Sequence, residues 1–493
     1  MANTTKIKEF YLWDFEGTLF PMETCRLLIE HRADALDEYI NKIVDPAQTQ
    51  YSFLSQETVY ANKAQYHLRR TMKLDPVAEY YLYKMGYENR GVFRKSHSEN
   101  RMNFGYRYEN GSPISIHDGF KDFKDTEKAF EDKYKYYIKF DIASYFNSIY
   151  HHDLTNWFSS LNVTNEQNEL FGKFMREINT GFSIDFLPHG LYPSKMLGSH
   201  FLNFVDNSGL IKCEQTIRFM DDYILYSDSK EILVKDFQVI QKILGQKSLN
   251  INSDKTVLFH EESSSIIDEV SDIKSRIIGK VRISSGSGMD YEEYEEVVRQ
   301  LSDDEITYLI NLLNDEEATD SEASLILDCI HEHSDDFEDY LPVFIYRFPH
   351  LAKKVFHKCA DVEPSKRNDL AAKFCDLLAD AYSLNEYQLF WVTKITEKYL
   401  LSTKSAGAIL SQLYEHKNAT MITKAKLLEI PEQRFGMPEW REVHLKNGSS
   451  SWLSWASAIG MRNDTKQNRN YLLKYFAKIS PMNSLIADYV LSQ

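Results

Sequence analysis

Two short β-prone runs meet at a pair of acids, and this pattern constrains the fold more than any other in the chain. The runs are Ile217–Phe219 and Tyr223–Tyr226, and they flank Asp221 and Asp222. Apolar, β-branched and aromatic residues around a short polar centre predict a β-hairpin with the acids at its turn. Asp is also common in turns for conformational reasons, so the pair alone does not require a catalytic site.

A third acid ends another strand-like run earlier in the chain. Residues 136–140 read Tyr-Tyr-Ile-Lys-Phe, and Asp141 follows directly. An Asp at a strand end is often only a turn residue or a helix cap. Carboxylates that converge from neighbouring strands can instead hold two Mg²⁺ ions, which prefer hard oxygen ligands and clamp the attacking and leaving oxygens of a phosphoryl transfer. The sequence therefore offers Asp141, Asp221 and Asp222 as metal-binding acids.

The residues around these acids resemble the motifs of reverse transcriptases, in the family's order. Residues 141–149 (Asp-Ile-Ala-Ser-Tyr-Phe-Asn-Ser-Ile) are similar to motif A, and residues 219–222 (Phe-Met-Asp-Asp) to motif C. Between them, residues 187–198 begin Leu-Pro-His-Gly-Leu-Tyr-Pro-Ser and are similar to motif B. Residues 249–256 (Leu-Asn-Ile-Asn-Ser-Asp-Lys-Thr) follow as motif D. The resemblance implies nucleotidyl transfer from deoxynucleoside triphosphates (dNTPs) with two Mg²⁺ ions, for which Mn²⁺ can substitute.

The resemblance also assigns roles to residues near the acids. It places the carbonyl of Ile142 beside a metal and Phe146 beneath the sugar, where the ring would exclude a 2′-hydroxyl. It places Gly190 where the backbone approaches the substrate closely, which suits a residue without Cβ. Lys255 would lie near the triphosphate and help to protonate pyrophosphate. Without the motifs, Phe146 can be a core residue and Lys255 a solvated lysine.

Charge is unevenly distributed along the chain, whose formal net charge is -16. Residues 1–260 hold 31 lysines and arginines against 35 acids, and residues 261–493 hold 26 against 38. Phosphate contacts need cations, so the second part is predicted to be a poor binder of duplex nucleic acid. Residues 84–107 hold six basic residues and two acidic ones. The resemblance places the fingers' triphosphate contacts there, whereas a solvated loop is the alternative; the candidates are Arg94, Lys95 and Arg101.

The periodicity of the first part predicts a mixed α and β region. Residues 20–85 are predicted to be mostly helical, and residues 86–119 a loop or hairpin region around Asn110-Gly111. Residues 153–180 and 230–247 have helical periodicity. With the resemblance, residues 1–262 are interpreted as the fingers and palm of a reverse transcriptase.

The second part is predicted to be all-α. A Ser- and Gly-containing linker is expected at residues 263–290 and helices throughout residues 291–493, including 322–333, 386–401 and 403–415. The fold class is therefore α+β, a fingers–palm unit followed by an all-α, HEAT-like helical-repeat domain. An irregular helical bundle is the open alternative, since no repeat with a fixed signature is visible.

A palm followed by acidic helices is similar to the abortive-infection and "unknown group" reverse transcriptases of bacteria. These include the AbiK and AbiA types and, closest in length, the prophage-encoded abortive-infection polymerase. The resemblance implies antiphage defence, homo-oligomers and DNA synthesis primed from a protein tyrosine, often without a template, with the single-stranded product covalently attached. Phe219 and His189 stand where Tyr and Gln are usual, which argues against ordinary templated copying. An RNA-templated enzyme with a dedicated noncoding RNA and a catalytically inactive defence scaffold remain open.

The priming residue is not identified by the sequence, because the chain has 31 tyrosines. Near the two ends of the chain, the candidates are Tyr11, Tyr39, Tyr51, Tyr60, Tyr471, Tyr475 and Tyr489.

The remaining composition predicts a soluble cytoplasmic protein. The five cysteines form no CxxC pair and their number is odd, a pattern of reduced thiols without a disulfide framework or zinc site. The first residues lack an apolar core, and no apolar run approaches the roughly 18 residues that a bilayer requires. We therefore expect no membrane contact.

Overall fold

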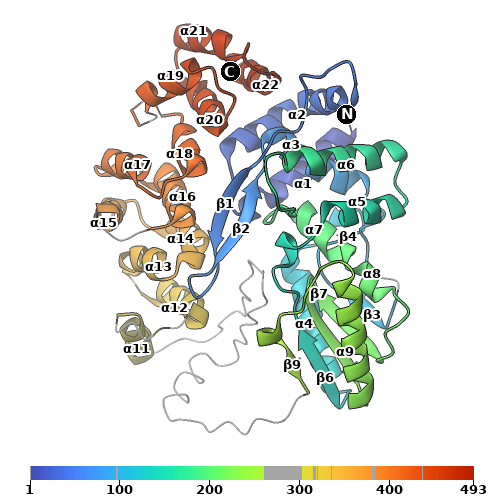
Figure 1. Ribbon diagram of the computed structural model, residues 1–493. Coiled ribbons are helices and arrows are strands. Elements are labelled where there is room, and N and C mark those ends of the chain that lie inside the picture. The colour runs from blue at the N-terminus through green and yellow to red at the C-terminus, as the bar shows by residue number, and fades with distance from the viewer. Residues whose placement is uncertain are drawn as a thin grey trace.

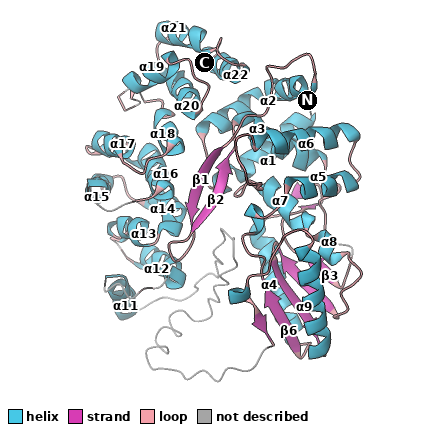
Figure 2. Ribbon diagram, viewed as in Figure 1, coloured by secondary structure: helices cyan, strands magenta, loops and turns pink. Residues whose placement is uncertain are grey.

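The computed structural model describes residues 2–95, 98–259, 303–314, 318, 320–334, 336–379, 384–432, 434–435 and 437–493. In these parts of the chain, N-terminal helices join a β-sheet with its own helices to a long row of helices (Figure 1). Figure 2 shows that the described strands all belong to the first part of the chain. The predicted linker at residues 263–290 lies outside the described residues.

The N-terminal helices form the layer that bridges the two halves (Figure 1). They are α1 (Ala2–Asp14), the short η1 (Phe15–Gly17), α2 (Glu23–Val44) and α3 (Pro76–Glu88). The start of α3 is fixed locally: the carboxylate of Asp75 accepts hydrogen bonds from the amides of Val77 and Ala78, and Pro76 occupies the first helical position. Both devices favour helix initiation, since they satisfy or remove amides that have no partner within the helix.

A β-hairpin interrupts the region that we predicted to be mostly helical, so that prediction is wrong for residues 57–73. Strands β1 (Glu57–Asn62) and β2 (Leu68–Lys73) pair antiparallel along their whole length. The turn between them places Gln65 and Tyr66 at φ of 57° and 58°. Non-glycine residues rarely adopt this left-handed conformation, so the sequence carries no ordinary turn signal there. In Figure 1 the hairpin lies between the sheet and the row of helices.

The central sheet has five strands in the order β3-β7-β8-β6-β9. They are β3 (Arg101–Asn103), β7 (Gln215–Phe219), β8 (Asp222–Ser227), β6 (Tyr136–Phe140) and β9 (Val257–Leu258). β3 runs parallel to β7, and the other neighbours are antiparallel. The hairpin predicted at residues 217–226 is therefore β7 and β8, and the predicted strand before Asp141 is β6.

Helices cover both faces of this sheet. On one face Phe120 of α4 (Ile116–Glu131) contacts Phe219, with 5.3 Å between the ring centroids. On the other, Phe237 of α9 (Lys230–Gly245) contacts Phe140 at the same separation. Side chains alternate between the faces of a strand, so the two helices enclose the sheet between aromatic layers.

The smaller elements of the first part surround this sheet. The Asn110-Gly111 turn joins β4 (Tyr108–Glu109) to β5 (Ser112–Pro113), which confirms the hairpin predicted there. Four more α-helices lie among the described residues of this part. They are α5 (His151–Ser160), α6 (Asn165–Ile178), α7 (Tyr192–Phe201) and α8 (Asn203–Asp206).

The second part of the chain is all-α in its described residues. Its helices are α11 (Asp303–Asn314), α12 (Asp320–His333), α13 (Leu341–Arg347), α14 (Ala352–Lys358), α15 (Arg367–Ala379), α16 (Glu386–Ile395), α17 (Ala406–Glu415), α18 (Met421–Leu428), α19 (Pro438–Lys446), α20 (Trp452–Gly460), α21 (Lys466–Phe476) and α22 (Pro481–Leu491). Successive even-numbered helices from α14 to α22 contact one another, and α13, α15 and α17 form a second layer. A HEAT-like repeat stays a prediction. No helix among the described residues combines the length and the apolar character needed to span a bilayer.

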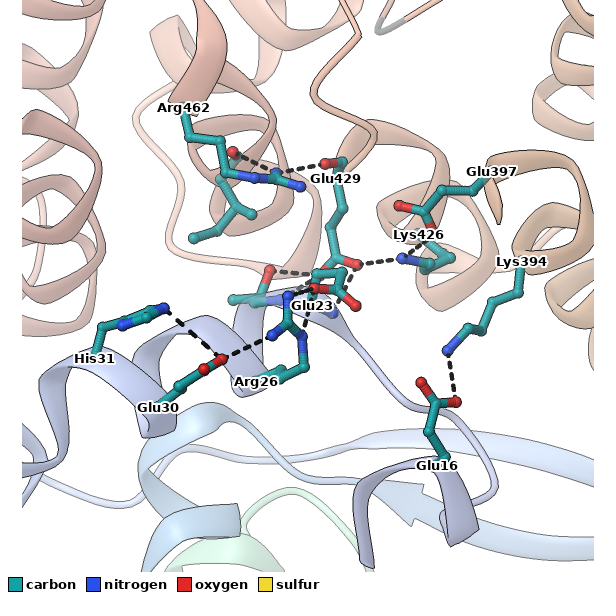
Figure 3. A network of polar contacts seen from close by, with 12 residues as sticks. Glu16, Glu23, Arg26, Glu30, His31, Lys394, Glu397, Lys426, Glu429 and Arg462 are labelled. Carbon is teal, nitrogen blue, oxygen red and sulfur yellow. Dashed lines mark hydrogen bonds and ion pairs between the residues drawn. The ribbon is translucent and has the colours of Figure 1, made fainter. Parts of the chain in front are cut away.

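A buried polar network joins the row of helices to the N-terminal layer (Figure 3). Glu429, which follows α18, accepts hydrogen bonds from the amides of Glu23 and Thr24 at 3.0 and 2.7 Å. These amides open α2 and have no partner within the helix, so the carboxylate caps it from more than 400 residues away. Lys426 lies 3.2 Å from Glu429 and 2.7 Å from Glu397, and its side chain is fully buried. The two halves therefore share one desolvated ionic cluster.

This cluster predicts a large effect of one substitution. Glu429→Ala leaves Lys426 with one partner fewer and two amides of α2 without a cap. We expect the free energy of unfolding to fall by about 3 to 5 kcal/mol, the cost of breaking a buried pair. Chemical denaturation of the full chain measures it. Glu432→Ala removes an exposed acid nearby and should change stability by less than about 0.5 kcal/mol; equal effects of the two substitutions would contradict the interpretation.

Candidate active site

The end of β6 positions the first acid. Asp141 follows β6 directly and is almost fully buried. Its backbone carbonyl accepts a hydrogen bond from the amide of Asn252 at 2.9 Å, and the amide of Ala143 donates to the carbonyl of Asn250 at 2.8 Å. Ile142 lies between these bonds and bridges to Ile251. Residues of motif D thus fix the backbone that follows the strand.

The β7–β8 turn positions the other two acids. Phe219 pairs with Asp222, so Met220 and Asp221 form a two-residue turn. Met220 has a φ of 58°, a conformation that non-glycine residues rarely adopt and that clusters at functional sites. Buried Arg218 donates to the carbonyl of Met220 at 3.2 Å and forms an ion pair of 2.7 Å with Asp206. The turn is therefore held by a buried ionic group beneath it.

The three acids meet at one edge of the sheet. Phe140 pairs with Tyr223 in the β6–β8 register, so the register continues to place Asp141 opposite Asp222. Burial raises the pKa of Asp221 to about 7, and the charge of Asp141 adds to the effect. Burial, together with the charges of Asp221 and Asp141, also raises the pKa of Asp222 well above its usual value. The charge of Asp141 therefore makes the charged forms of Asp221 and Asp222 more costly.

Two lysines, Lys63 and Lys255, lie close to these carboxylates. The ammonium group of Lys255 lies 3.7 Å from a carboxylate oxygen of Asp141. Lys63, in the β1–β2 turn, has a pKa that burial lowers; the charges of Arg69 and Lys255 lower it further, and those of Asp221 and Asp141 oppose this. Lys63 thus lies close to the acids and to Lys255, and Arg69 lies close to Lys63. The sequence did not indicate either residue as a site residue, because the helical prediction for residues 20–85 concealed the hairpin that carries them.

The rings of Phe146 and His189 pack against each other beside the loop that follows Asp141, and together they are called the wall. Phe146 lies in the turn after Asp141 and is 8% exposed. Its ring centroid is 4.4 Å from that of His189. The hydroxyl of Thr71 on β2 accepts a hydrogen bond from the amide of His189 at 2.7 Å and donates to its carbonyl at 3.1 Å. The β1–β2 hairpin is therefore bonded directly to motif B.

Gly190 has a φ of 91° and packs against Leu19 of the N-terminal segment. A Cβ atom at Gly190 would lie 2.6 Å from Cγ of Leu19, closer than carbon atoms can approach. Both the backbone conformation and this contact therefore require glycine. In this structure the close neighbour of Gly190 is the chain itself, at Leu19, and the predicted approach to the substrate stays a prediction.

Of the three predicted basic residues, Arg101 lies at the end of the sheet away from the acids. Arg101 donates to the carbonyls of Ile211 and Cys213 at 3.0 and 2.9 Å. It pairs with Thr216, at the end of β7 far from the Met220–Asp221 turn. Arg94 and Lys95 are exposed beside β4. The structure does not bring Arg101 to a triphosphate at the acids, and its side chain is engaged in holding a loop; the charge run alone could not reveal this.

The region that carries the acids matches a known protein family. Residues 102–310 match the family model described as "Reverse transcriptase (RNA-dependent DNA polymerase)". The chain contains a reverse transcriptase domain. This domain makes it an enzyme of the nucleotidyltransferase class, of the RNA-directed DNA polymerase type. The matched residues include all three acids and motifs A to D.

Similarities to individual proteins are weaker. No curated protein matches significantly. Among solved structures, the chain is similar to telomerase from Candida albicans at 12% identity and a TM-score of 0.28, over 78% of this chain and 68% of that one. For telomerase from Candida tropicalis the values are 14% identity, a TM-score of 0.28, and 74% and 64%. Both were solved with a fragment of telomeric RNA. Scores this low do not establish a shared overall fold.

The acids fit a divalent cation that brings further ligands with it. No group of three or more His, Cys, Asp or Glu side chains in the described residues forms a ready-made metal cage. Mg²⁺ commonly takes one or two carboxylates and completes its shell with water and substrate phosphates. Asp141, Asp221 and Asp222 supply hard oxygens. Burial and mutual repulsion raise the pKa values of Asp221 and Asp222, and the repulsion would fall when a cation binds.

Because of this repulsion, removing one carboxylate should raise the stability of the protein without divalent ions and weaken its response to Mg²⁺. Asp221→Asn removes a buried charge but keeps the shape of the side chain. Without divalent ions, we expect the variant to be more stable than the wild type by about 1 to 3 kcal/mol, since each unit of pKa shift corresponds to about 1.4 kcal/mol. Adding Mg²⁺ should raise the Tm of the wild type more than that of the variant. Differential scanning fluorimetry measures both; equal Mg²⁺ responses would contradict metal binding by Asp221.

Proposed function

We propose that the chain is a DNA polymerase of reverse-transcriptase type that transfers nucleotides from dNTPs at Asp141, Asp221 and Asp222. The observation that carries the proposal is the position of these acids close to the cations Lys63 and Lys255. A dNTP carries its negative charge on the triphosphate and reacts at the α-phosphorus. A site with acids for Mg²⁺ on one side and cations for phosphate on the other matches that distribution.

The roles of the side chains follow from their positions. The three acids would hold two divalent ions, which activate the attacking hydroxyl and stabilise the leaving pyrophosphate when bound. Lys63 and Arg69 would bind the outer phosphates from the β1–β2 hairpin. Lys255 would neutralise charge near Asp141 and can donate a proton to the leaving pyrophosphate.

The sugar would lie against the wall of Phe146 and His189. Both rings are buried and the backbone of His189 is bonded to Thr71, so neither ring can move away at low cost. A 2′-hydroxyl directed at Phe146 would meet a hydrocarbon surface that cannot hydrogen-bond to it. Deoxynucleotides would be preferred for this reason.

We further propose that the enzyme acts in antiphage defence and starts DNA synthesis from a tyrosine hydroxyl, without a conventional template. The support is the resemblance to abortive-infection reverse transcriptases, the residues Phe219 and His189, and the contact of Leu19 with Gly190. That contact fills the surface next to motif B with the chain itself, which leaves less room for a paired template. Assembly into homo-oligomers is part of the same proposal.

The exposure of the candidate tyrosines favours some of them as the priming residue but does not identify a single one. Tyr11, Tyr39 and Tyr489 are buried, and the hydroxyl of Tyr11 donates to Glu79. Tyr60, Tyr471 and Tyr475 are exposed. A hydroxyl that attacks a phosphorus must reach the metal site, which favours exposed residues.

Nucleotide addition gives the first test. The purified chain is incubated with labelled dNTPs and Mg²⁺ or Mn²⁺, without primer or template, and separated on a denaturing gel. We expect label that migrates with the protein and disappears after nuclease treatment. Asp221→Asn combined with Asp222→Asn should reduce incorporation by about 1,000-fold or more, because the divalent ions lose two ligands.

Controls separate the outcomes of this experiment. Asp228→Asn alters an exposed acid at the other end of β8 and should retain activity. A product that is complementary to a copurifying RNA would replace the template-independent proposal with the RNA-templated one. Phage protection that survives loss of Asp221 and Asp222 would instead identify an inactive scaffold.

The wall at Phe146 gives a second test. Phe146→Val opens space beneath the sugar, so we expect the preference for dNTPs over ribonucleotides to fall by about 10- to 100-fold. Single-nucleotide incorporation with each substrate measures this, and a thermal melt shows whether the variant is folded. If the ratio of kcat/KM values is unchanged in a folded variant, Phe146 does not contact the sugar.

A further inference from the structure

The β1–β2 hairpin lies between the central sheet and the row of helices (Figure 1). On the side of the acids, its contacts come from β2. The guanidinium group of Arg70 donates to the side-chain oxygen of Asn147, in motif A, at 3.3 and 3.4 Å. The next residue, Thr71, makes two hydrogen bonds with the backbone of His189 in motif B. One strand of the hairpin is therefore bonded to motif A and to motif B.

The other strand, β1, is bonded to the row of helices. The carboxylate of Glu386, at the start of α16, accepts a hydrogen bond from the backbone amide of Tyr60 at 3.1 Å. Its second oxygen accepts from the hydroxyl of Thr420, and the Glu386 side chain is buried. Tyr60 pairs with Arg70 in the register of the hairpin. At this level, therefore, the helical row holds one strand and motif A holds the other.

A second acid of the row holds the turn of the hairpin. The carboxylate of Asp320, the first residue of α12, accepts a hydrogen bond from the backbone amide of Gln65 at 3.0 Å. Gln65 and Tyr66 both have left-handed φ angles, and such a backbone persists in non-glycine residues only where its surroundings fix it. Across the same turn, the amide of Lys63 donates to the carbonyl of His67 at 2.8 Å. Asp320 therefore helps to fix a strained turn.

Lys63 links this turn to the active site. It follows β1 directly and lies between Tyr60 and Gln65, the two residues whose amides are held by the helical row. Its side chain is partly exposed and close to Asp141 and Asp221. The backbone on either side of Lys63 cannot shift far without breaking one of these hydrogen bonds. The position of its ammonium group relative to the acids therefore depends on carboxylates of the second half of the chain.

We propose that Asp320 and Glu386 are positioning residues for nucleotide binding, which hold Lys63, through the hairpin, where it contacts the outer phosphates of a dNTP. The inference rests on the proposed function for its ligand, and it adds that the helical row is part of the nucleotide site. Neither carboxylate contacts the substrate. Without them the hairpin moves, and Lys63 occupies several positions of which only some bind phosphate. The affinity for the nucleotide then falls with the fraction of the chain that is competent to bind it.

Equilibrium binding of a dNTP analogue tests this inference without catalysis. The analogue cannot be cleaved between its α- and β-phosphates, and isothermal titration calorimetry with Mg²⁺ gives its Kd for the full chain. For Asp320→Ala combined with Glu386→Ala, we expect affinity to fall about tenfold, because Lys63 is in place for only part of the time. Asp320→Asn combined with Glu386→Gln keeps an oxygen that accepts each amide, so this variant should bind within about threefold of the wild type.

A thermodynamic cycle with Lys63 separates positioning from other effects of the substitutions. If both carboxylates act through Lys63, their loss in a Lys63→Ala background should weaken binding by no more than about twofold. A further loss of about tenfold in that background would overturn the proposal, because the carboxylates would then act without Lys63. Equal affinities of the wild type and the Asp320/Glu386 alanine variant would overturn it as well.

Controls exclude effects of misfolding and of net charge. Asp369→Ala combined with Asp376→Ala removes two exposed acids of α15 and should leave affinity unchanged. In the Asp320/Glu386 alanine variant, hydrogen exchange measured by mass spectrometry should become faster at residues 60–65, and unchanged exchange there would overturn the proposal. If this variant does not fold, Asp320→Ala alone, at a partly exposed residue, gives the same test with a smaller expected loss of affinity.

Nucleotide incorporation distinguishes this inference from the proposed function. In an active enzyme, we expect the alanine variant to raise the KM for dNTP about tenfold and to lower kcat by less than about threefold, because saturating dNTP selects the positions in which Lys63 binds it. An unchanged KM in an active variant would reject the positioning role and keep the polymerase. A wild type that binds the analogue more tightly than the alanine variant, yet incorporates no dNTP, would reject the polymerase and keep the positioning role.

Discussion

The crowding of three carboxylates, two buried and one half-buried, at one sheet edge is the constraint on which the rest of the structure depends. Asp141, Asp221 and Asp222 come from adjacent strand ends, and burial and mutual repulsion raise the pKa values of the last two. A fold keeps such an unfavourable group only if its surroundings fix it in place. Here the left-handed backbone of Met220 and the buried Arg218–Asp206 pair hold the turn. The same crowded carboxylates that destabilise this edge of the sheet allow it to bind cations.

The β1–β2 hairpin supplies the opposite charge, and both halves of the chain hold it. Thr71 joins the hairpin to motif B through hydrogen bonds. On the other side of the hairpin, carboxylates of the helical row accept hydrogen bonds from the backbone amides of the hairpin. Glu386 accepts from Tyr60 at 3.1 Å, and Asp320 accepts from Gln65 at 3.0 Å. The positions of Lys63 and Arg69 therefore depend on helices more than 250 residues away in the sequence. The acidic second half of the chain therefore helps to position the site through its contacts with the hairpin, and it also caps the start of α2.

The sequence predicted the acids better than the cations, and the reasons are physical. Asp141 and the β7–β8 turn lie in short motifs whose strand pattern is local, so spacing was enough to bring them together. Lys63 and Arg69 lie in a hairpin whose turn uses left-handed Gln65 and Tyr66, residues that signal no turn. Arg101 lies in a basic run, yet its partners are backbone carbonyls of Ile211 and Cys213, which only the folded chain reveals.

Contacts between distant parts of the chain were equally hidden. Nothing in the sequence around Glu429 indicates that it caps a helix near the N-terminus, and nothing around Leu19 indicates that it covers Gly190. Such contacts depend on how whole layers pack. Local patterns therefore predicted the α+β palm and the all-α second part, while the junction between them required the structure.

The central claim is that the three acids hold two divalent ions together with a dNTP. The most direct measurement is anomalous X-ray scattering from crystals of the full chain grown with Mn²⁺ and a dNTP analogue that cannot be cleaved between the α- and β-phosphates. Two Mn²⁺ peaks roughly 3.5–4 Å apart, both within bonding distance of the carboxylates of Asp141, Asp221 or Asp222, are expected. An ordered analogue with no Mn²⁺ at these carboxylates would contradict the account.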